Sequence, residues 1–258
     1  MRDILRRILH WSGEETIVRR RGRTFSVSET DSSKTFSING TIQSVMMKNS
    51  EYSRDYWDLF PPLCYAFDMP RVLMIGLGGG TIARQIGARF GDRVSIDIVE
   101  IDSEVVRLSR QFFDSGHGHR ITVGDGASAV RSRKNAYDII ILDAYEGDLI
   151  PEQFLREGFA RDAHDSLKNH GVLAINYIST MRYNGALDDY MRVLSAHFSV
   201  YEATMPRITS NSVVVCTKNV EKKGIVERMR RGLGFGNYDL QILSAYENMR
   251  LFSAESRE

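Results

Sequence analysis

Residues 71–81 read RVLMIGLGGGT, a short apolar segment that ends in a run of glycines. The apolar part has the length of a buried strand, and the glycines allow the tight turn that leads from a strand into a helix. Free backbone amides in such a turn suit electron-rich ligand atoms, so Gly76, Gly78 and Gly80 are candidate ligand-binding residues. Tight turns of this kind also occur without a ligand, and the segment alone therefore predicts a strand and a helix.

The sequence after residue 71 alternates short apolar segments with amphipathic ones. This alternation predicts a Rossmann-like α/β fold, in which a mostly parallel sheet carries helices on both faces. About ten residues, including Pro206, separate the last two strands, which is too short for a helical crossover and favours an antiparallel last strand. The predicted strands cover residues 72–75, 94–99, 121–123, 139–142, 172–176, 198–202 and 212–217, and the predicted helices cover 82–90, 105–112, 155–167 and 187–198.

The region before this alternation has a different pattern. Residues 16–18, 24–28 and 35–38 alternate in the way of short strands, which predicts a small antiparallel β-sheet. We therefore expect two domains, an N-terminal β domain over residues 1–65 and a nucleoside-binding catalytic domain over 66–258. The second domain should end in two helices, over residues 221–231 and from the following glycine-rich turn to about residue 252.

The composition excludes several classes of protein. The chain has 258 residues, 34 Lys+Arg against 33 Asp+Glu and a net charge of +1, whereas nucleic-acid binders and disordered chains carry a large net charge. No apolar run approaches the roughly 20 residues that a membrane helix requires, so we expect a soluble protein. Two cysteines are too few for a disulfide framework, which favours a reducing cytoplasm. The pair His117 and His119 lacks a recognisable third ligand, so no metal is predicted.

Acidic residues follow the predicted parallel strands, where ligands bind in such sheets. Glu100 ends the second strand about 20 residues after the glycines, a position from which a carboxylate accepts both hydroxyls of a ribose. Asp102 precedes Ser103 and better suits the start of a helix. Asp125, after the third strand, suits either the exocyclic amine of adenine or a helix cap.

Three carboxylates, Asp143, Glu146 and Asp148, follow the fourth strand. A site mouth with this much negative charge repels a pyrophosphate and attracts a cationic sulfonium nucleoside. Thr81 also stands where the dinucleotide-binding fingerprint has its third glycine. The sequence therefore favours an S-adenosyl ligand over a dinucleotide.

With these motifs, residues 11–217 resemble the spermidine synthase (polyamine aminopropyltransferase) family. The resemblance lies in the segments 39–43, 76–81, 99–102, 125–126, 137–143 and 167–176 and in a linker with Tyr52. The family has a class I methyltransferase-like fold and transfers an aminopropyl group from decarboxylated S-adenosylmethionine to a diamine.

The resemblance implies a role for each candidate residue. Asp143 matches the aspartate that accepts the proton of the attacking amine. Aromatic residues near it would lie against the alkylammonium chain, or alternatively pack between the two domains. Donor-binding residues would be Gly76, Gly78, Gly80, Glu100, Ile101, Asp125 and Gly126, and acceptor-binding residues would be Gln43, Tyr52, Tyr145 and Glu146.

One departure from the family pattern leaves the donor open. The family's glycine loop carries an aspartate that anchors the amine of the aminopropyl group, and this chain has Gly79 there. An S-adenosylmethionine-dependent methyltransferase is therefore the alternative function.

Basic runs at residues 19–23 and 222–231 suggest a nucleic-acid or partner-binding module, which the near-zero net charge disfavours. A homodimer through the exposed face of the N-terminal sheet is a further expectation, with a small diamine or polyamine as the partner.

Overall fold

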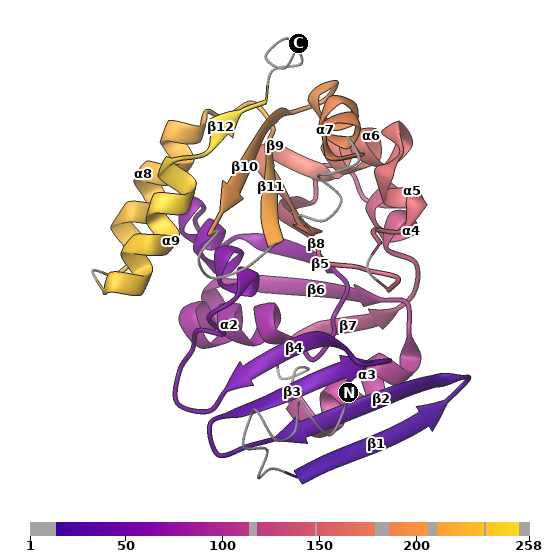
Figure 1. Ribbon diagram of the computed structural model, residues 1–258. Helices are drawn as coiled ribbons and strands as arrows, with labels where there is room; N and C mark the ends of the chain where they lie inside the picture. The colour runs from indigo at the N-terminus through magenta and orange to yellow at the C-terminus, as the bar shows by residue number, and fades with distance from the viewer. Residues whose placement is uncertain are drawn as a thin grey trace.

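The computed structural model describes residues 14–113, 118–147, 149–178, 186–205, 211–234 and 236–252. Its first sheet is antiparallel and lies at one end of the molecule (Figure 1). The three predicted strands are present, and a fourth, which carries Gln43, was not predicted because its apolar residues are contiguous rather than alternating. In order across the sheet, the strands are β1 (Glu14–Arg20), β2 (Arg23–Glu29), β3 (Ser33–Ile38) and β4 (Thr41–Met47).

The second sheet has eight strands in the order β12-β10-β11-β9-β8-β5-β6-β7. Strands β5 to β9 are parallel to one another, and β11 runs antiparallel to both β9 and β10, which confirms the predicted antiparallel last strand. Its strands are β5 (Arg71–Ile75), β6 (Ser95–Glu100), β7 (Arg120–Val123), β8 (Tyr137–Leu142), β9 (Leu167–Ile178), β10 (Ser199–Thr204), β11 (Asn211–Thr217) and β12 (Arg250–Leu251).

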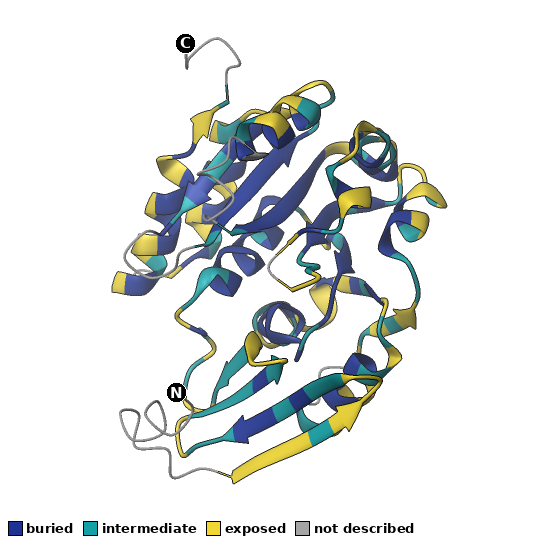
Figure 2. Ribbon diagram, turned by 45° about the vertical axis from the view of Figure 1, so that its right-hand side comes forward, coloured by how far each residue is buried: buried dark blue, intermediate teal, exposed yellow. Residues whose placement is uncertain are grey.

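Helices cover both faces of this sheet, as predicted, and its central strands are almost wholly buried, whereas the edge strands β7 and β12 are largely exposed (Figure 2). The two faces form separate hydrophobic clusters because successive strand residues point to opposite sides. Cys64 belongs to one cluster and Cys216 to the other, and both are buried free thiols. One face packs against α2 (Thr81–Phe90), α3 (Ser103–Phe113), α8 (Lys222–Gly232) and α9 (Asn237–Glu247), and the other against α4 (Gly126–Arg131), α5 (Glu152–Leu155), α6 (Glu157–Ser166) and α7 (Ala186–Ser195).

Three predicted helices were wrong at their ends. The helix expected over residues 187–198 ends at Ser195. The single helix expected over residues 155–167 is two helices, α5 and α6, because the backbone of Arg156 is extended between them, and Leu167 already begins β9. The last helix ends at Glu247 rather than near residue 252. Residues 250–251 instead pair with the open edge of β10, and the backbone amide of Phe252 donates to the carbonyl of Val200.

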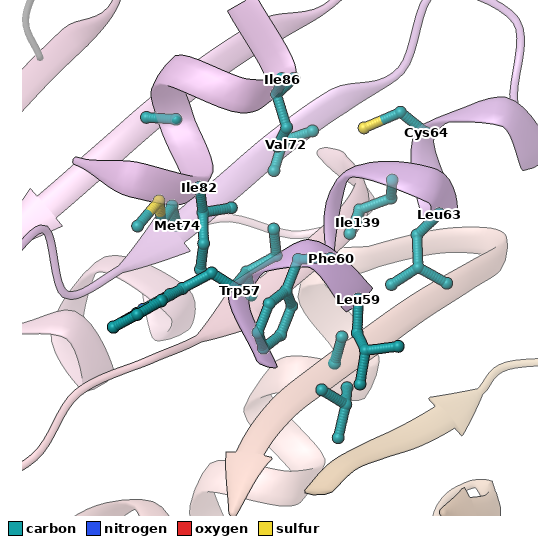
Figure 3. Close-up of a cluster of buried hydrophobic side chains, with 14 of the residues drawn as sticks. Trp57, Leu59, Phe60, Leu63, Cys64, Val72, Met74, Ile82, Ile86 and Ile139 are labelled. Atoms are coloured by element: carbon teal, nitrogen blue, oxygen red, sulfur yellow. The ribbon is translucent and has the colours of Figure 1, made fainter. Parts of the chain in front are cut away.

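Two short 3₁₀ helices, η1 (Tyr56–Leu59) and η2 (Pro61–Ala66), connect the sheets. Trp57, Leu59 and Phe60 pack against side chains of α2, β5 and β8 (Figure 3). The domain boundary at residue 65 stays a prediction.

The strand order reverses between β5 and β8, so the connections that leave these two strands go to opposite faces of the sheet. A crevice at the carboxyl ends of such strands is the usual ligand site of an open α/β sheet. Within the described residues, no helix has both the length and the apolar character that a membrane crossing requires.

Candidate active site

The glycine turn after β5 is enclosed on two sides by other parts of the chain. Gly76 has φ of +91°, and a Cβ there would overlap the backbone carbonyl of Asp143. Gly78 has φ of +53°, and its Cβ would lie 2.7 Å from the carbonyl oxygen of Gln43 in β4. Glycine is therefore required at both positions, by the backbone conformation and by the close approach of β8 and β4.

A cavity of about 910 Å³ lies over this turn at the carboxyl ends of the parallel strands. Its walls come from the N-terminal sheet, the glycine turn and the loops after β6, β7 and β8. Of the residues predicted from the sequence, it is lined by Gln43, Gly76, Gly78, Glu100, Ile101, Asp125, Gly126, Asp143, Tyr145 and Glu146. Gly80 does not line it and is the residue before α2, in the left-handed conformation.

Glu100 lies at the floor of the cavity with only 8% of its surface exposed. Its Oε2 accepts a 2.9 Å hydrogen bond from the backbone amide of Leu77, and its Oε1 accepts one of 2.9 Å from that of Asp102. Burial raises the pKa of Glu100, while these amides favour the ionised form. The amides fix the carboxylate in one orientation, and each oxygen keeps a second acceptor site. The next residue, Ile101, is 72% exposed and adds an apolar wall.

Asp125 caps the N-terminus of α4, which is one of the two roles predicted for it. Its Oδ2 accepts from the backbone amide of Ser128 at 2.8 Å, and its Oδ1 accepts from Nε2 of Gln153 at 2.9 Å. Burial raises the pKa of Asp125, but the hydrogen bonds from Ser128 and Gln153 outweigh it and hold the pKa below its usual value. The carboxylate therefore stays ionised at the rim of the cavity.

Asp143 is the most perturbed carboxylate of the site. Its Oδ1 accepts a 2.8 Å hydrogen bond from Nδ2 of Asn176 and one of 3.2 Å from the Tyr56 hydroxyl. Burial raises its pKa to about 6, although hydrogen bonds from Asn176, Tyr56 and Trp57 act in the opposite direction. A carboxylate with this pKa is ionised at neutral pH and takes up a proton more readily than an exposed aspartate.

A second cavity of about 430 Å³ borders the first at Asp143. Gln43, Asp143 and Tyr145 line both cavities, so Asp143 lies where the two meet. The second cavity is also lined by Asp55, Tyr56, Trp57, Asn176 and Asn211.

The charge of the larger cavity is strongly one-sided. Two cations line it among the described residues: Arg23, which forms an ion pair with Asp102, and Arg156, which lies 2.8 Å from Oε1 of Glu152. The remaining lining carboxylates have no cation among these lining residues, and they are Glu100, Asp125, Asp143 and Glu146. Asp148, the other acidic residue predicted at this mouth, lies outside the described residues.

Tyr52 does not line either cavity. Its hydroxyl donates to Asp239 of α9, and its ring packs edge-on against Tyr238. Tyr56, four residues later, is the linker tyrosine that reaches Asp143. Tyr56, Asn176 and Asn211 were not predicted from the sequence, although Asn176 is conspicuous as an amide in the apolar part of β9, residues 172–178.

Gly79 lies against Ser44 of β4. The Ser44 hydroxyl oxygen accepts a 2.6 Å hydrogen bond from the Gly79 amide, and a Cβ at Gly79 would lie 2.8 Å from the Ser44 Cβ. Ser44 is only 1% exposed, so the position from which a side chain would project is filled by β4. Within the described part of the chain, no three side chains of the metal-binding types converge on one point, and His117 lies outside it.

The strand order, with a small antiparallel sheet before it and an antiparallel strand at one end of the main sheet, is that of a class I methyltransferase-like fold. Residues 61–225 match the family model described as "Spermine/spermidine synthase domain". The chain belongs to the spermine/spermidine synthase family.

Individual proteins similar to this chain include aminopropyltransferases and a methyltransferase. The chain is 30% identical over 151 residues to a polyamine aminopropyltransferase of Vibrio vulnificus, which covers 56% of this chain and 49% of that protein. It is 33% identical over 160 residues to an N-terminal histidine N-methyltransferase of Emericella nidulans, over 57% of this chain and 28% of the other. A probable spermidine synthase structure from Corynebacterium glutamicum shares the fold, with a TM-score of 0.69, 18% identity and coverage of 94% and 98%. The matches thus span about half or less of these two relatives' length.

Proposed function

We propose that this chain transfers an aminopropyl group from decarboxylated S-adenosylmethionine to the amine of a diamine or polyamine. The observation that carries the proposal is the position of Asp143, a carboxylate with a raised pKa at the junction of two cavities. A transfer reaction needs one site for the donor, one for the acceptor and a proton acceptor between them. Relatives named polyamine aminopropyltransferase and family membership support the same activity.

The larger cavity suits the nucleoside of the donor. Glu100 has free acceptor capacity toward the ribose hydroxyls, Asp125 toward the adenine amine, and Ile101 offers an apolar surface for the base. The excess of carboxylates favours a donor with a positively charged sulfonium, because opposite charges attract more strongly in a partly buried site. The glycine turn lets the backbone approach the ligand closely.

The reaction is a direct displacement. The acceptor nitrogen attacks the methylene carbon next to the sulfonium, the new N–C bond forms as the C–S bond breaks, and the electron pair of that bond neutralises the sulfur. The nitrogen first loses a proton, which Asp143 accepts. The products are the aminopropylated amine and methylthioadenosine. Tyr56 and Asn176 hold the Asp143 carboxylate in place for this transfer.

The smaller cavity suits the acceptor. Asp55 and Asp143 supply negative charge, and Tyr145 and Trp57 supply aromatic surface for an alkylammonium chain. Glu146, at the mouth of the larger cavity, would meet the distal ammonium of a longer polyamine.

The test is an assay of the purified protein with decarboxylated S-adenosylmethionine and a panel of diamines and polyamines, analysed by mass spectrometry. We expect methylthioadenosine and an acceptor heavier by one aminopropyl group, and far slower product formation by Asp143→Asn. Absence of methylthioadenosine with every amine would refute the proposal.

A methyltransferase that uses S-adenosylmethionine is the second candidate, and the contact of Gly79 with Ser44 favours it. The glycine turn presents no carboxylate to repel the methionine carboxylate or to anchor an aminopropyl amine. Calorimetry with the two nucleosides decides between the candidates: tighter binding of the decarboxylated form supports aminopropyl transfer, and tighter binding of S-adenosylmethionine supports methyl transfer.

We also propose a cytoplasmic location and a homodimer, which would form through the free edge of the N-terminal sheet rather than through its exposed face. Strand β1 pairs with β2, and within the described residues no strand covers its other edge. A second copy paired antiparallel about Ile17 would bring Glu14 opposite Arg20, and Ile17 is 46% exposed on that strand. Sedimentation of the wild type and of Ile17→Lys tests the dimer. The free thiols Cys64 and Cys216 agree with a reducing compartment.

A further inference from the structure

Three side chains from neighbouring strands form a chain of hydrogen bonds that ends at Asp143. Asp143 follows β8, Asn176 lies in β9, and Asn211 is the first residue of β11. Because β11 is antiparallel to β9, its first residue lies at the edge of the sheet where the parallel strands end. Asn211 pairs with Ile178 in the register, so its side chain is on the same face as that of Asn176.

Both side-chain amides donate in the same direction, from Asn211 to Asn176 and from Asn176 to Asp143. Nδ2 of Asn211 donates to Oδ1 of Asn176 at 2.9 Å, and Nδ2 of Asn176 donates to Oδ1 of Asp143 at 2.8 Å. Asn176 is buried, so water does not readily replace either partner. If the Asn176 amide turned over, its oxygen would face the Asp143 carboxylate and two acceptors would oppose each other. The donor from Asn211 stabilises the orientation that avoids this.

We propose that Asn211 is a positioning residue for Asp143, which acts by holding the Asn176 amide with its nitrogen toward the carboxylate. The catalytic meaning of this role rests on the proposed function, whereas the hydrogen-bonded arrangement itself does not. In this series of hydrogen bonds, Asn211 contacts Asn176, and only Asn176 contacts Asp143.

Other groups also act on Asp143, and the test has to separate them. Tyr56 and Trp57 of η1 donate hydrogen bonds to it, and Tyr145 of the following loop is a titratable neighbour. Asp55 lines the same cavity, and Glu100 and Glu146 line the larger one. Each of these groups is unchanged by a substitution at Asn211, so differences between variants at this position report on the amide pair.

The fluorescence of Trp57 offers a readout that needs no substrate. The chain has two tryptophans, and Trp11→Phe leaves Trp57 as the only one. Its emission should change as Asp143 ionises near pH 6, and Asp143→Asn should remove that transition. On this background, Asn211→Asp replaces a donor with an acceptor, so Asn176 turns its nitrogen toward residue 211 and its oxygen toward Asp143. We expect the midpoint to rise by about one pH unit, a tenfold change in the ionisation constant.

Matched variants distinguish this relay from a direct effect of the new charge. Asn176→Leu has nearly the same shape and cannot relay a hydrogen bond, so Asn211→Asp on that background should shift the midpoint much less. Asn211→Ala removes the donor without adding charge and should also raise the midpoint. Equal shifts with and without Asn176, or no shift with either substitution at Asn211, would overturn the proposal. Circular dichroism of each variant shows that it is folded. An intact relay in a protein with no transferase activity would refute the proposed function alone.

Discussion

The hydroxyl oxygen of Ser44 accepts a 2.6 Å hydrogen bond from the backbone amide of Gly79. This contact joins the N-terminal sheet to the glycine turn at the position where the family pattern has an aspartate. The close packing there leads to a first prediction about the effect of restoring that aspartate.

Gly79→Asp should lower the free energy of unfolding by about 1–3 kcal/mol, the usual cost of overpacking a filled site. A Cβ at residue 79 would lie 2.8 Å from the Ser44 Cβ, so Ser44→Gly should partly relieve the cost. Ser44→Ala keeps the Cβ and should not relieve it. Thermal denaturation of the single and double variants measures this coupling, and equal rescue by Gly and Ala would contradict the packing argument.

The fall of kcat/KM at acid pH should reflect the protonation of Asp143. Its raised pKa of about 6 predicts that kcat/KM falls tenfold per pH unit below pH 6, because the protonated carboxyl no longer accepts a proton. Asp143→Asn should lower kcat by about 10²–10⁴ and abolish the pH-dependent limb. Steady-state kinetics with the acceptor identified by the assay measures both effects. A profile that stays flat down to pH 4.5 would exclude Asp143 as the base.

The same group should make the folded state less stable as the pH rises. Its pKa is raised on folding, so the folded protein binds the proton more tightly, and stability is lost between pH 3.8 and about pH 6 as Asp143 ionises. Asp143→Asn should therefore increase the free energy of unfolding at pH 8, by up to about 3 kcal/mol. The increase should become smaller as the pH falls below 6 and disappear below pH 3.8. Urea denaturation at pH 8 and pH 5 tests the difference, and a gain of equal size at both values would contradict it.

Glu100→Gln should weaken nucleoside binding. The amide nitrogen of glutamine would face the backbone amide of Leu77 or of Asp102, and one of the two fixed hydrogen bonds would be lost. We expect the Kd of methylthioadenosine to rise about 10–100-fold, or about 1.4–2.7 kcal/mol. Glu104→Gln makes the same charge change on α3 outside the cavity and should leave the Kd unchanged in calorimetry.

The linker tyrosines should differ sharply in their effects. Tyr56→Phe removes a hydrogen bond to Asp143, so the acid limb of the rate profile should move to higher pH. Tyr52→Phe removes a hydrogen bond to Asp239 and should leave this limb in place, while lowering the free energy of unfolding by about 1 kcal/mol. A shift with Tyr52→Phe and none with Tyr56→Phe would show that the two positions are assigned the wrong way round.

The local patterns of the sequence predicted most of the sheet and the carboxylates that line the cavity. Glu100 ends one strand of clear apolar character and Asp143 follows another, and parallel strands bring their carboxyl ends to one edge. Tyr56, Asn176 and Asn211 were not predictable in the same way. Asn211 reaches the site because β11 runs antiparallel and pairs with β9, and Tyr56 reaches it because Asp58 accepts hydrogen bonds from Ser53, Gln85 and Tyr238, residues far apart in the chain. Such contacts depend on tertiary packing, which spacing along the sequence does not contain.

The two buried cysteines can report separately on the opening of the two helical layers. Cys64 lies beneath the helical layer that includes α8, and Cys216 lies beneath the opposite layer with α7. Burial raises the pKa of both thiols, so an alkylating reagent reacts with either one only after its own layer has opened. The ratio of the two labelling rates therefore tells which layer separates from the sheet first, and nucleoside added during labelling would reveal which of these openings its binding suppresses.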